Sequence, residues 1–416
     1  MAYEQGLSGL AAASNDLDVI GNNISNANTV GFKQSTAQFA DVYANTLATT
    51  VNTSIGIGTS LASVAQNFSQ GTIDTTGDAL DVAINGSGFF QMSNNGTLTY
   101  SRDGEFQLNS DGYIVNSSGL DLMGYAADAN GVVNTAETVP LQVSTTNIAP
   151  LATSNITAQL NLDSEDTTPT DSFSTTDSSS YNYQTSIATN DSLGGSNTVD
   201  MYFVNNGTGS SSSGDTTWTV YAGTSGDVSD VGTVTFDSSG NLVSSTDADG
   251  NASTTTGTLS VSVTPTDGAA AQTINLNLAG TTQYGSASGV NDLAQDGYAS
   301  GSLSSFSIGS DGTISGTYSN GETKTLGQVV LANFNDPNGL EDLGGNQYAQ
   351  TIASGAAQIS APGDTNHGTL TGGAVEDSNV DLTNQLVDLI TAQMDYQANS
   401  QTIKTQQTVD QTLLQM

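Results

Sequence analysis

Apolar residues spaced seven apart mark both ends of this 416-residue chain, and this spacing is the strongest constraint on its fold. A helix with such spacing presents one narrow apolar seam to a partner helix. At the N-terminal end the spaced residues are Tyr3, Leu10, Leu17 and Ile24, with Leu7 at the intermediate step. At the C-terminal end they are Leu382, Leu389, Tyr396 and Ile403, with Leu386 at the intermediate step. Two ordinary amphipathic helices on a globular core would give a similar stripe, but its presence at both ends favours helices that pair as a coiled coil.

Each of these helices needs a partner, because an isolated helix of about 24 residues is marginal in water. Glycine lowers helix stability by about 1 kcal/mol relative to alanine, and Gly21 lies within the first stripe. Asp381 precedes the second stripe and is suited to cap that helix. We therefore expect the ten spaced residues to make contacts within the chain and between neighbouring copies of it.

Between the two ends the apolar period changes from seven to two, which indicates β-strands. Leu80, Val82 and Ile84 alternate with less apolar residues. Asn95-Gly96 and Asp111-Gly112 separate pairs of such runs, and these dipeptides are strong hairpin signals. The stretch from Ala48 to Ser63 is rich in Thr, Ser and Gly and predicts a loop.

The middle of the chain, residues 149–290, has further strand-like runs and no basic residue, which predicts a separate all-β unit. The fold class expected is therefore mostly β with terminal α-helices, in a nested multidomain architecture. The terminal helical domain comprises 1–24 and 380–416, with connecting segments at 25–70 and 366–379. The inner β domain comprises 71–148 and 291–365, and the inserted outer β domain comprises 149–290.

The charge of the chain limits its partners. Four Lys and Arg residues stand against 41 Asp and Glu residues, for a formal net charge of −37. Nucleic acids and anionic membrane surfaces both require basic side chains, so neither is expected as a partner.

No apolar stretch is long enough for a membrane span. No basic residue precedes Lys33, so the N-terminus does not resemble a cleaved secretory signal.

The composition also argues against catalysis, a metal site or a bound cofactor. The chain has no cysteine, and His367 is its single histidine, which excludes thiolate chemistry and sites built on several histidines. A pair of carboxylates could still form a glycosidase site, although such clefts are usually aromatic-lined and the chain has one Trp. Asp247-Ala248-Asp249-Gly250 resembles the start of a calcium loop but lacks the third ligand and the final Glu, so a β-turn is favoured. An acidic calcium-binding surface adhesin remains an alternative.

Several stretches resemble the signatures of the bacterial flagellar rod and hook family. The segment 9–26 with Gly31-Phe32-Lys33 is similar to the N-terminal signature of that family. Residues 373–376 and 378–382 are similar to its C-terminal signature. The signature residues that this resemblance singles out are Asn22, Asn23, Asn26, Gly31, Phe32, Lys33, Asn379 and Asp381.

The length of the chain and its single large insert favour a hook protein over a rod protein, which remains the alternative within the family. The resemblance implies a structural protein, not an enzyme, that polymerises into a flexible curved tube and transmits torque from rod to filament. It also implies export through the flagellar type III apparatus without a cleaved signal, and an extracellular location in the hook of the flagellum. The implied partners are other copies of the chain, the distal rod protein, the hook cap and the hook–filament junction protein.

Overall fold

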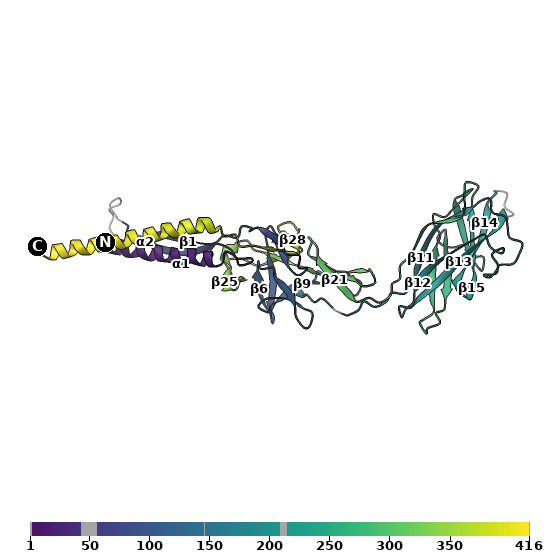
Figure 1. Cartoon of the computed structure of the whole chain (residues 1–416), viewed down its shortest axis with the longest axis horizontal. Helices are drawn as coiled ribbons and strands as arrows, with labels where there is room; N and C mark the ends of the chain where they lie inside the picture. The colour runs from purple at the N-terminus through teal and green to yellow at the C-terminus, as the bar shows by residue number, and fades with distance from the viewer. Residues whose placement is uncertain (1, 43–55, 145, 209–213, 416) are drawn as a thin grey trace. The chain divides into compact units, whose positions relative to one another are not determined.

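The structure is a computed structural model that describes residues 2–42, 56–144, 146–208 and 214–415 (Figure 1). It divides into two compact units. Unit 1 comprises Met1–Thr145, Ser305–Thr317 and Thr323–Met416, and unit 2 comprises Thr146–Ser304 and Tyr318–Glu322. Strands predominate in both units, and the helices lie near the two ends of the chain, which confirms the predicted fold class.

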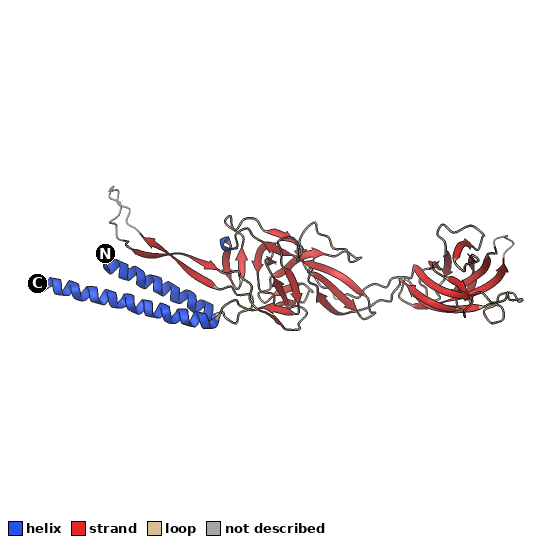
Figure 2. Cartoon of the chain, turned by 90° about the horizontal axis from the view of Figure 1, so that it is seen from above, coloured by secondary structure: helices blue, strands red, loops and turns tan. Residues whose placement is uncertain are grey.

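The two predicted terminal helices are present and pack against each other within unit 1 (Figure 2). Helix α1 spans Ala2–Ser25 and helix α2 spans Leu382–Leu414. The pair is antiparallel, because Gly6 lies against Ile403 near one end and Asn23 contacts Gln385 near the other. Asp381 caps α2 as predicted, since its carboxylate accepts hydrogen bonds from the backbone N–H groups of Thr383 and Asn384.

A long antiparallel hairpin of β1 (Ser35–Val42) and β2 (Gly58–Gln66) runs beside α1. This hairpin corrects the loop predicted for 48–63, because residues 58–63 belong to β2, whereas 48–55 lie outside the described residues. The strand was missed because most of its side chains are small or polar and exposed, so no apolar alternation marks it.

The β domain of unit 1 is built from both flanks of the chain. Its main sheet has the strand order β21-β22-β23-β9-β5-β6-β26-β25. Two short antiparallel pairs, β29 with β3 and β28 with β4, join its C-terminal flank to its N-terminal flank. The predicted Asn95-Gly96 hairpin turn connects β5 to β6, with positive φ angles of 49° and 93°.

The strand bounds from the N-terminal flank of unit 1 are β3 Ile73–Thr75, β4 Val82–Asn85, β5 Phe89–Asn94, β6 Thr97–Ser101, β7 Phe106–Leu108, β8 Ile114–Asn116, β9 Asp121–Ala126 and β10 Val139–Pro140. Those from the C-terminal flank are β21 Leu303–Ile308, β22 Thr313–Tyr318, β23 Thr323–Val329, β24 Leu331–Asn333, the 3₁₀ turn η1 Pro337–Gly339, β25 Glu341–Gly344, β26 Gln347–Ala349, β27 Gln358–Ser360, β28 Thr369–Gly372 and β29 Ala374–Glu376. The aromatic rings of Phe89, Tyr100, Phe334 and Tyr348 pack edge to face in the core between them.

Unit 2 is a β-sandwich. One sheet has the order β12-β13-β14-β15-β16, and the other has the order β17-β18-β11-β19 with β20 paired to β11. Trp218, Phe203 and Phe236 from the first sheet share one buried core with Ile156 and Ile274 from the second. The bounds are β11 Asn155–Asp163, β12 Tyr183–Asn190, β13 Ser196–Thr208, β14 Thr216–Thr224, β15 Asp227–Phe236, β16 Leu242–Asp247, β17 Thr258–Val263, β18 Gln272–Asn277, β19 Thr282–Tyr284 and β20 Gly289–Gln295.

The end of the insert differs from the boundary expected at residue 290. Strand β20 pairs with β11, so the chain leaves unit 2 only at Ser304. The apolar residues of β20 do not alternate, and it is the pairing with β11 that assigns this strand to unit 2.

Candidate assembly interface

The closest contacts between α1 and α2 are made by small residues. A Cβ atom added to Gly6 would lie 2.9 Å from Cγ1 of Ile403. One added to Gly9 would lie 2.7 Å from Oδ1 of Asn399. A larger side chain at either position would force the side chain of Ile403 or Asn399 to move, so glycine is favoured by the close approach rather than by its backbone freedom.

A buried polar pair lies at the other end of the same seam. The Nδ2 group of Asn23 donates to Oε1 of Gln385 at 3.0 Å, and both side chains are buried. Asn23 also bonds the backbone N–H and C=O of Ser35, which ties β1 to the helix pair. A buried polar pair of this kind favours one helix register over others, because slipping would break the hydrogen bond between the two buried amides.

Three carboxylates line a groove of about 250 Å³ between α1, α2 and β1. They belong to Asp16, Asp388 and Asp395. Burial raises the pKa of Asp16, and the two carboxylates on α2 raise it further. Mutual repulsion across the groove therefore weakens the helix pair when all three groups are ionised.

The ten heptad residues do not all lie in this seam. The half-buried residues are Leu10, Leu17, Ile24, Leu389 and Ile403. The exposed residues are Tyr3, Leu7, Leu382, Leu386 and Tyr396. Gly6, Gly9 and Asn23, which make the contacts described above, each lie one position before a residue of the apolar stripe on α1. The role of the ten heptad residues in contacts between subunits stays a prediction.

Sequence reasoning missed a second apolar stripe on α2. Val387, Ile390 and Met394 follow each other at steps of three and four residues and are 58%, 55% and 57% exposed. Residues at these steps lie on one face of a helix. The spacing was visible in the sequence, but the search for a seven-residue period passed over it.

Residues of the family signatures meet where the helices join the β domain. The buried carboxylate of Glu376 forms ion pairs with Nζ of Lys33 at 2.6 Å and with Nη1 of Arg102 at 3.1 Å. Oε1 of Glu376 also accepts from the backbone N–H of Gly71, and Lys33 also donates to the carbonyl of Ser69. For both cations, burial lowers the pKa and the carboxylate raises it, and repulsion from Arg102 adds to the lowering at Lys33.

Asn379 binds the same junction with its side-chain amide. Its Oδ1 accepts from the backbone N–H of Gln34 at 2.8 Å. Its Nδ2 lies 2.7 Å from the carbonyl of Asn67 and 3.1 Å from that of Ser69. One side chain thus connects the segments that lead to both helices and to the hairpin.

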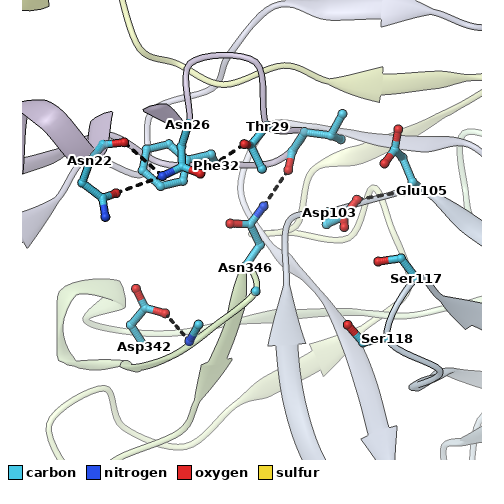
Figure 3. Close-up of a pocket in the computed structure, with 13 residues that line it drawn as sticks. Asn22, Asn26, Thr29, Phe32, Asp103, Glu105, Ser117, Ser118, Asp342 and Asn346 are labelled. Atoms are coloured by element: carbon cyan, nitrogen blue, oxygen red, sulfur yellow. Dashed lines mark hydrogen bonds between the residues drawn. The ribbon is translucent and has the colours of Figure 1, made fainter. Parts of the chain in front are cut away.

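The remaining signature residues shape the turn after α1 and a polar pocket of about 450 Å³ beside it (Figure 3). Asn26 donates to the backbone carbonyl of Asn22 at 3.0 Å, and both residues line the pocket with Phe32. Gly31 has a φ of 70°, and a Cβ there would meet the backbone of Arg102 and Asp103.

Asp103 lines that pocket, and burial raises its pKa to about 6. Repulsion from Glu105 and Asp81 raises this pKa further by smaller amounts. The backbone N–H of Glu105 donates to the carboxylate of Asp103 and lowers it. Burial therefore favours the protonated form of Asp103, close to the buried ion pairs of Lys33, Arg102 and Glu376.

Within the described ranges, no group of three or more His, Cys, Asp or Glu side chains is placed to hold a metal ion. The helices that the structure describes are all too short or too polar to cross a membrane.

Four family models match successive parts of the chain. They are described as "Flagella basal body rod protein" (4–33), "Flagellar hook protein FlgE/F/G D1 domain" (83–159), "Flagellar basal body protein FlaE D2 domain" (161–298) and "Flagellar basal body rod FlgEFG protein C-terminal" (371–416). The signature residues at the helix–β junction fall in the first and last of these matches or beside them.

Relatives match over the whole chain. The flagellar hook protein FlgE of Salmonella typhimurium is 39% identical over 429 residues, covering 100% of both chains. FlgE of Escherichia coli is 39% identical over 427 residues with the same coverage, and FlgE of Treponema pallidum is 33% identical, covering 99% of this chain and 98% of its own. The crystal structure of Helicobacter pylori FlgE2 matches with a TM-score of 0.53 over 71% of this chain and 98% of that one, and at 14% identity it supports the fold alone. The chain belongs to the flagellar hook protein FlgE family.

Proposed function

We propose that this chain is the structural subunit of a flagellar hook and that copies of it polymerise through the outer faces of their terminal helices. The observation that carries this proposal is the placement of the apolar residues on α2. Leu386, Val387, Ile390 and Met394 are all about half exposed, although the helix pair is already formed. A single chain therefore leaves uncovered an apolar stripe that a neighbouring copy can cover.

The energetics favour this covering. Burying one leucine-sized side chain contributes roughly 1.5 to 3 kcal/mol. The helices are already ordered by their own seam, so a neighbouring copy adds burial at little further cost in chain entropy. Contacts between different faces of identical subunits produce an open helical polymer when the rotation from one copy to the next does not close a ring.

The family relationship supports the finer parts of the proposal. The polymer is a curved, flexible tube that transmits torque from the rod to the filament, outside the cell, in the hook of the flagellum. The chain reaches it through the flagellar type III export apparatus without cleavage of a signal peptide. Its other partners are the distal rod protein, the hook cap and the hook–filament junction protein.

A rod protein is the second candidate, because the models that match both terminal segments are described as basal body rod proteins. Electron microscopy of polymer grown from the purified chain separates the two. Curved tubes support the hook assignment, and short straight rods support the alternative.

The helix-face proposal is tested by Ile390→Asp, which places a charge in the exposed stripe of α2. Gln407→Asp is the matched control, because it adds the same charge to an exposed position of α2 outside that stripe. We expect Ile390→Asp to abolish polymer and Gln407→Asp to retain it, as measured by sedimentation and microscopy. Polymer of normal yield from the Ile390 variant would contradict this interface.

A further inference from the structure

Three chain segments lie at the junction between the helical end of unit 1 and its β domain. The first (26–34) joins α1 to β1, the second (67–72) leads from β2 into the β domain, and the third (377–381) leads from the β domain into α2. We call α1, α2, β1 and β2 together the helical arm. In Figure 2 the helix pair and the hairpin leave the β domain from the same end. Only the second and third segments connect the arm to the β domain, and two such connections would by themselves let the arm swing. Its direction therefore depends on the contacts that link all three segments.

Glu376 provides one set of links. Its carboxylate contacts Lys33 in the first segment, Gly71 in the second and Arg102 at the end of β6. Arg102 is held in turn by the carbonyl of Gly86, to which Nη2 donates at 3.0 Å, and by the ring of Phe89. The carboxylate therefore connects the arm to the β domain at a buried point.

Asn379 provides a second set, three residues further along the chain. It bonds Gln34 in the first segment and Asn67 and Ser69 in the second, and it lies itself in the third. Asn346, in the turn between β25 and β26, links the β domain to the first segment, because its side-chain amide donates a hydrogen bond to the carbonyl of Val30 at 2.7 Å. All three connecting segments are thus linked to one another.

A gain in stability is a poor explanation for the charged set. Burial lowers the pKa of Lys33 and Arg102 although the nearby carboxylate raises it, and repulsion from Arg102 adds to the lowering at Lys33, so desolvation opposes the attraction. Buried ion groups of this kind are often no more stable than apolar side chains of similar volume, and their best-attested use is to specify one arrangement.

We propose that Glu376 and Asn379 are positioning residues that make the junction a rigid joint, fixing the direction of the helical arm relative to the β domain of unit 1. The joint keeps unit 1 from bending between its helices and its β domain. Flexibility of the assembled tube must then arise elsewhere, either at contacts between subunits or between the two units. The joint belongs to the free chain and does not depend on the proposed polymer.

The test measures the spread of arm directions in the free chain. The chain has no cysteine, so spin labels on Thr97→Cys in β6 and Gln393→Cys in α2 report the distance across the joint by pulsed electron resonance. We expect one narrow distance in the parent. Asn379→Ala should add a second, broad population of distances, and so should the charge-free variant Lys33→Met/Arg102→Met/Glu376→Leu.

Two controls separate joint loosening from general damage. Asn116→Ala removes a buried asparagine that braces a turn inside the β domain, so it should leave the distance narrow. Labels on Asp18→Cys and Gln393→Cys report the helix pair itself, and their distance should stay unchanged in every variant. A narrow Thr97–Gln393 distance in both joint variants, or equal broadening in the Asn116 control, overturns the proposal. Failure of both joint variants to fold also overturns it, because these residues would then support the β domain rather than its joint.

Discussion

The buried charges at the junction make a sharp prediction about stability. Glu376→Gln keeps the shape of the side chain but leaves the cations of Lys33 and Arg102, which are 0% and 3% exposed in their side chains, without a counter-ion. Removing one partner of a buried ion pair typically costs about 3 to 5 kcal/mol. We expect a loss of that size in the free energy of unfolding of unit 1. Replacing all three side chains, as in Lys33→Met/Arg102→Met/Glu376→Leu, should change it by less than about 1 kcal/mol or increase it.

The chain offers two separate signals for this measurement. Its one tryptophan, Trp218, is buried in the core of unit 2, so tryptophan fluorescence reports the unfolding of unit 2. Helices α1 and α2 belong to unit 1, so helical circular dichroism reports unit 1. With urea slopes of about 1 to 3 kcal/mol per molar, Glu376→Gln should lower the dichroism midpoint by about 1 to 5 M and leave the fluorescence midpoint in place. An equal shift of both signals, or a triple variant as unstable as Glu376→Gln, would refute the reasoning.

Four further predictions follow from other parts of the chain. Gly9→Leu should separate the helices by its clash with Asn399 and lower helical dichroism, whereas Gly21→Ala, which meets nothing within 4 Å, should stabilise α1 by about 1 kcal/mol. The raised pKa of Asp103 favours its protonated form in the folded state. Its contribution to stability, at most about 3 kcal/mol, is therefore complete below about pH 4 and is lost as the pH rises through about 6. Asp103→Asn should remove this pH dependence, as measured by urea titrations. Replacing residues 146–304, the main segment of unit 2, with a short Gly-Ser linker should leave polymer visible by microscopy. Polymer should dissolve as NaCl is lowered towards about 10 mM, where like charges are poorly screened, and a yield that stays flat over that range would contradict this.

The helix pair could be predicted from the sequence, but its contact surface could not. Large apolar residues such as Leu10 and Leu17 dominate any search for periodicity. The helices approach closely at Gly6 and Gly9, where an added Cβ atom would lie within 3 Å of a side chain of α2. Glycine carries no apolar signal, so its role at these positions shows only when the partner helix is in place. A periodic stripe therefore predicts that a helix will be covered, without saying whether its own partner or a neighbouring copy covers it.

The contacts at the junction between the helices and the β domain could not be predicted from local sequence patterns, for a different reason. Resemblance to the family singled out Lys33 and Asn379. Lys33 and Glu376, however, lie 343 positions apart, and the local sequence around either residue does not identify the other as its ion-pair partner. The β1–β2 hairpin was missed because its strands are stabilised by pairing and by contact with α1 rather than by an apolar face. In both cases the missing information is tertiary, which short-range spacing does not contain.

The charge distribution decides what kind of contact can join copies of this chain. Two of the four basic residues, Lys33 and Arg102, are buried on one glutamate and offset none of the surface charge. The backbone N–H groups of Val132 and Asn130 lower the pKa of the Asp128 carboxyl, and a third basic residue, Lys324, adds a smaller lowering. In the proposed polymer, neighbouring copies would therefore bring together strongly acidic surfaces with few cations to form ion pairs. We propose that apolar burial supplies the attraction instead, through the exposed stripe of Leu386, Val387, Ile390 and Met394 on α2.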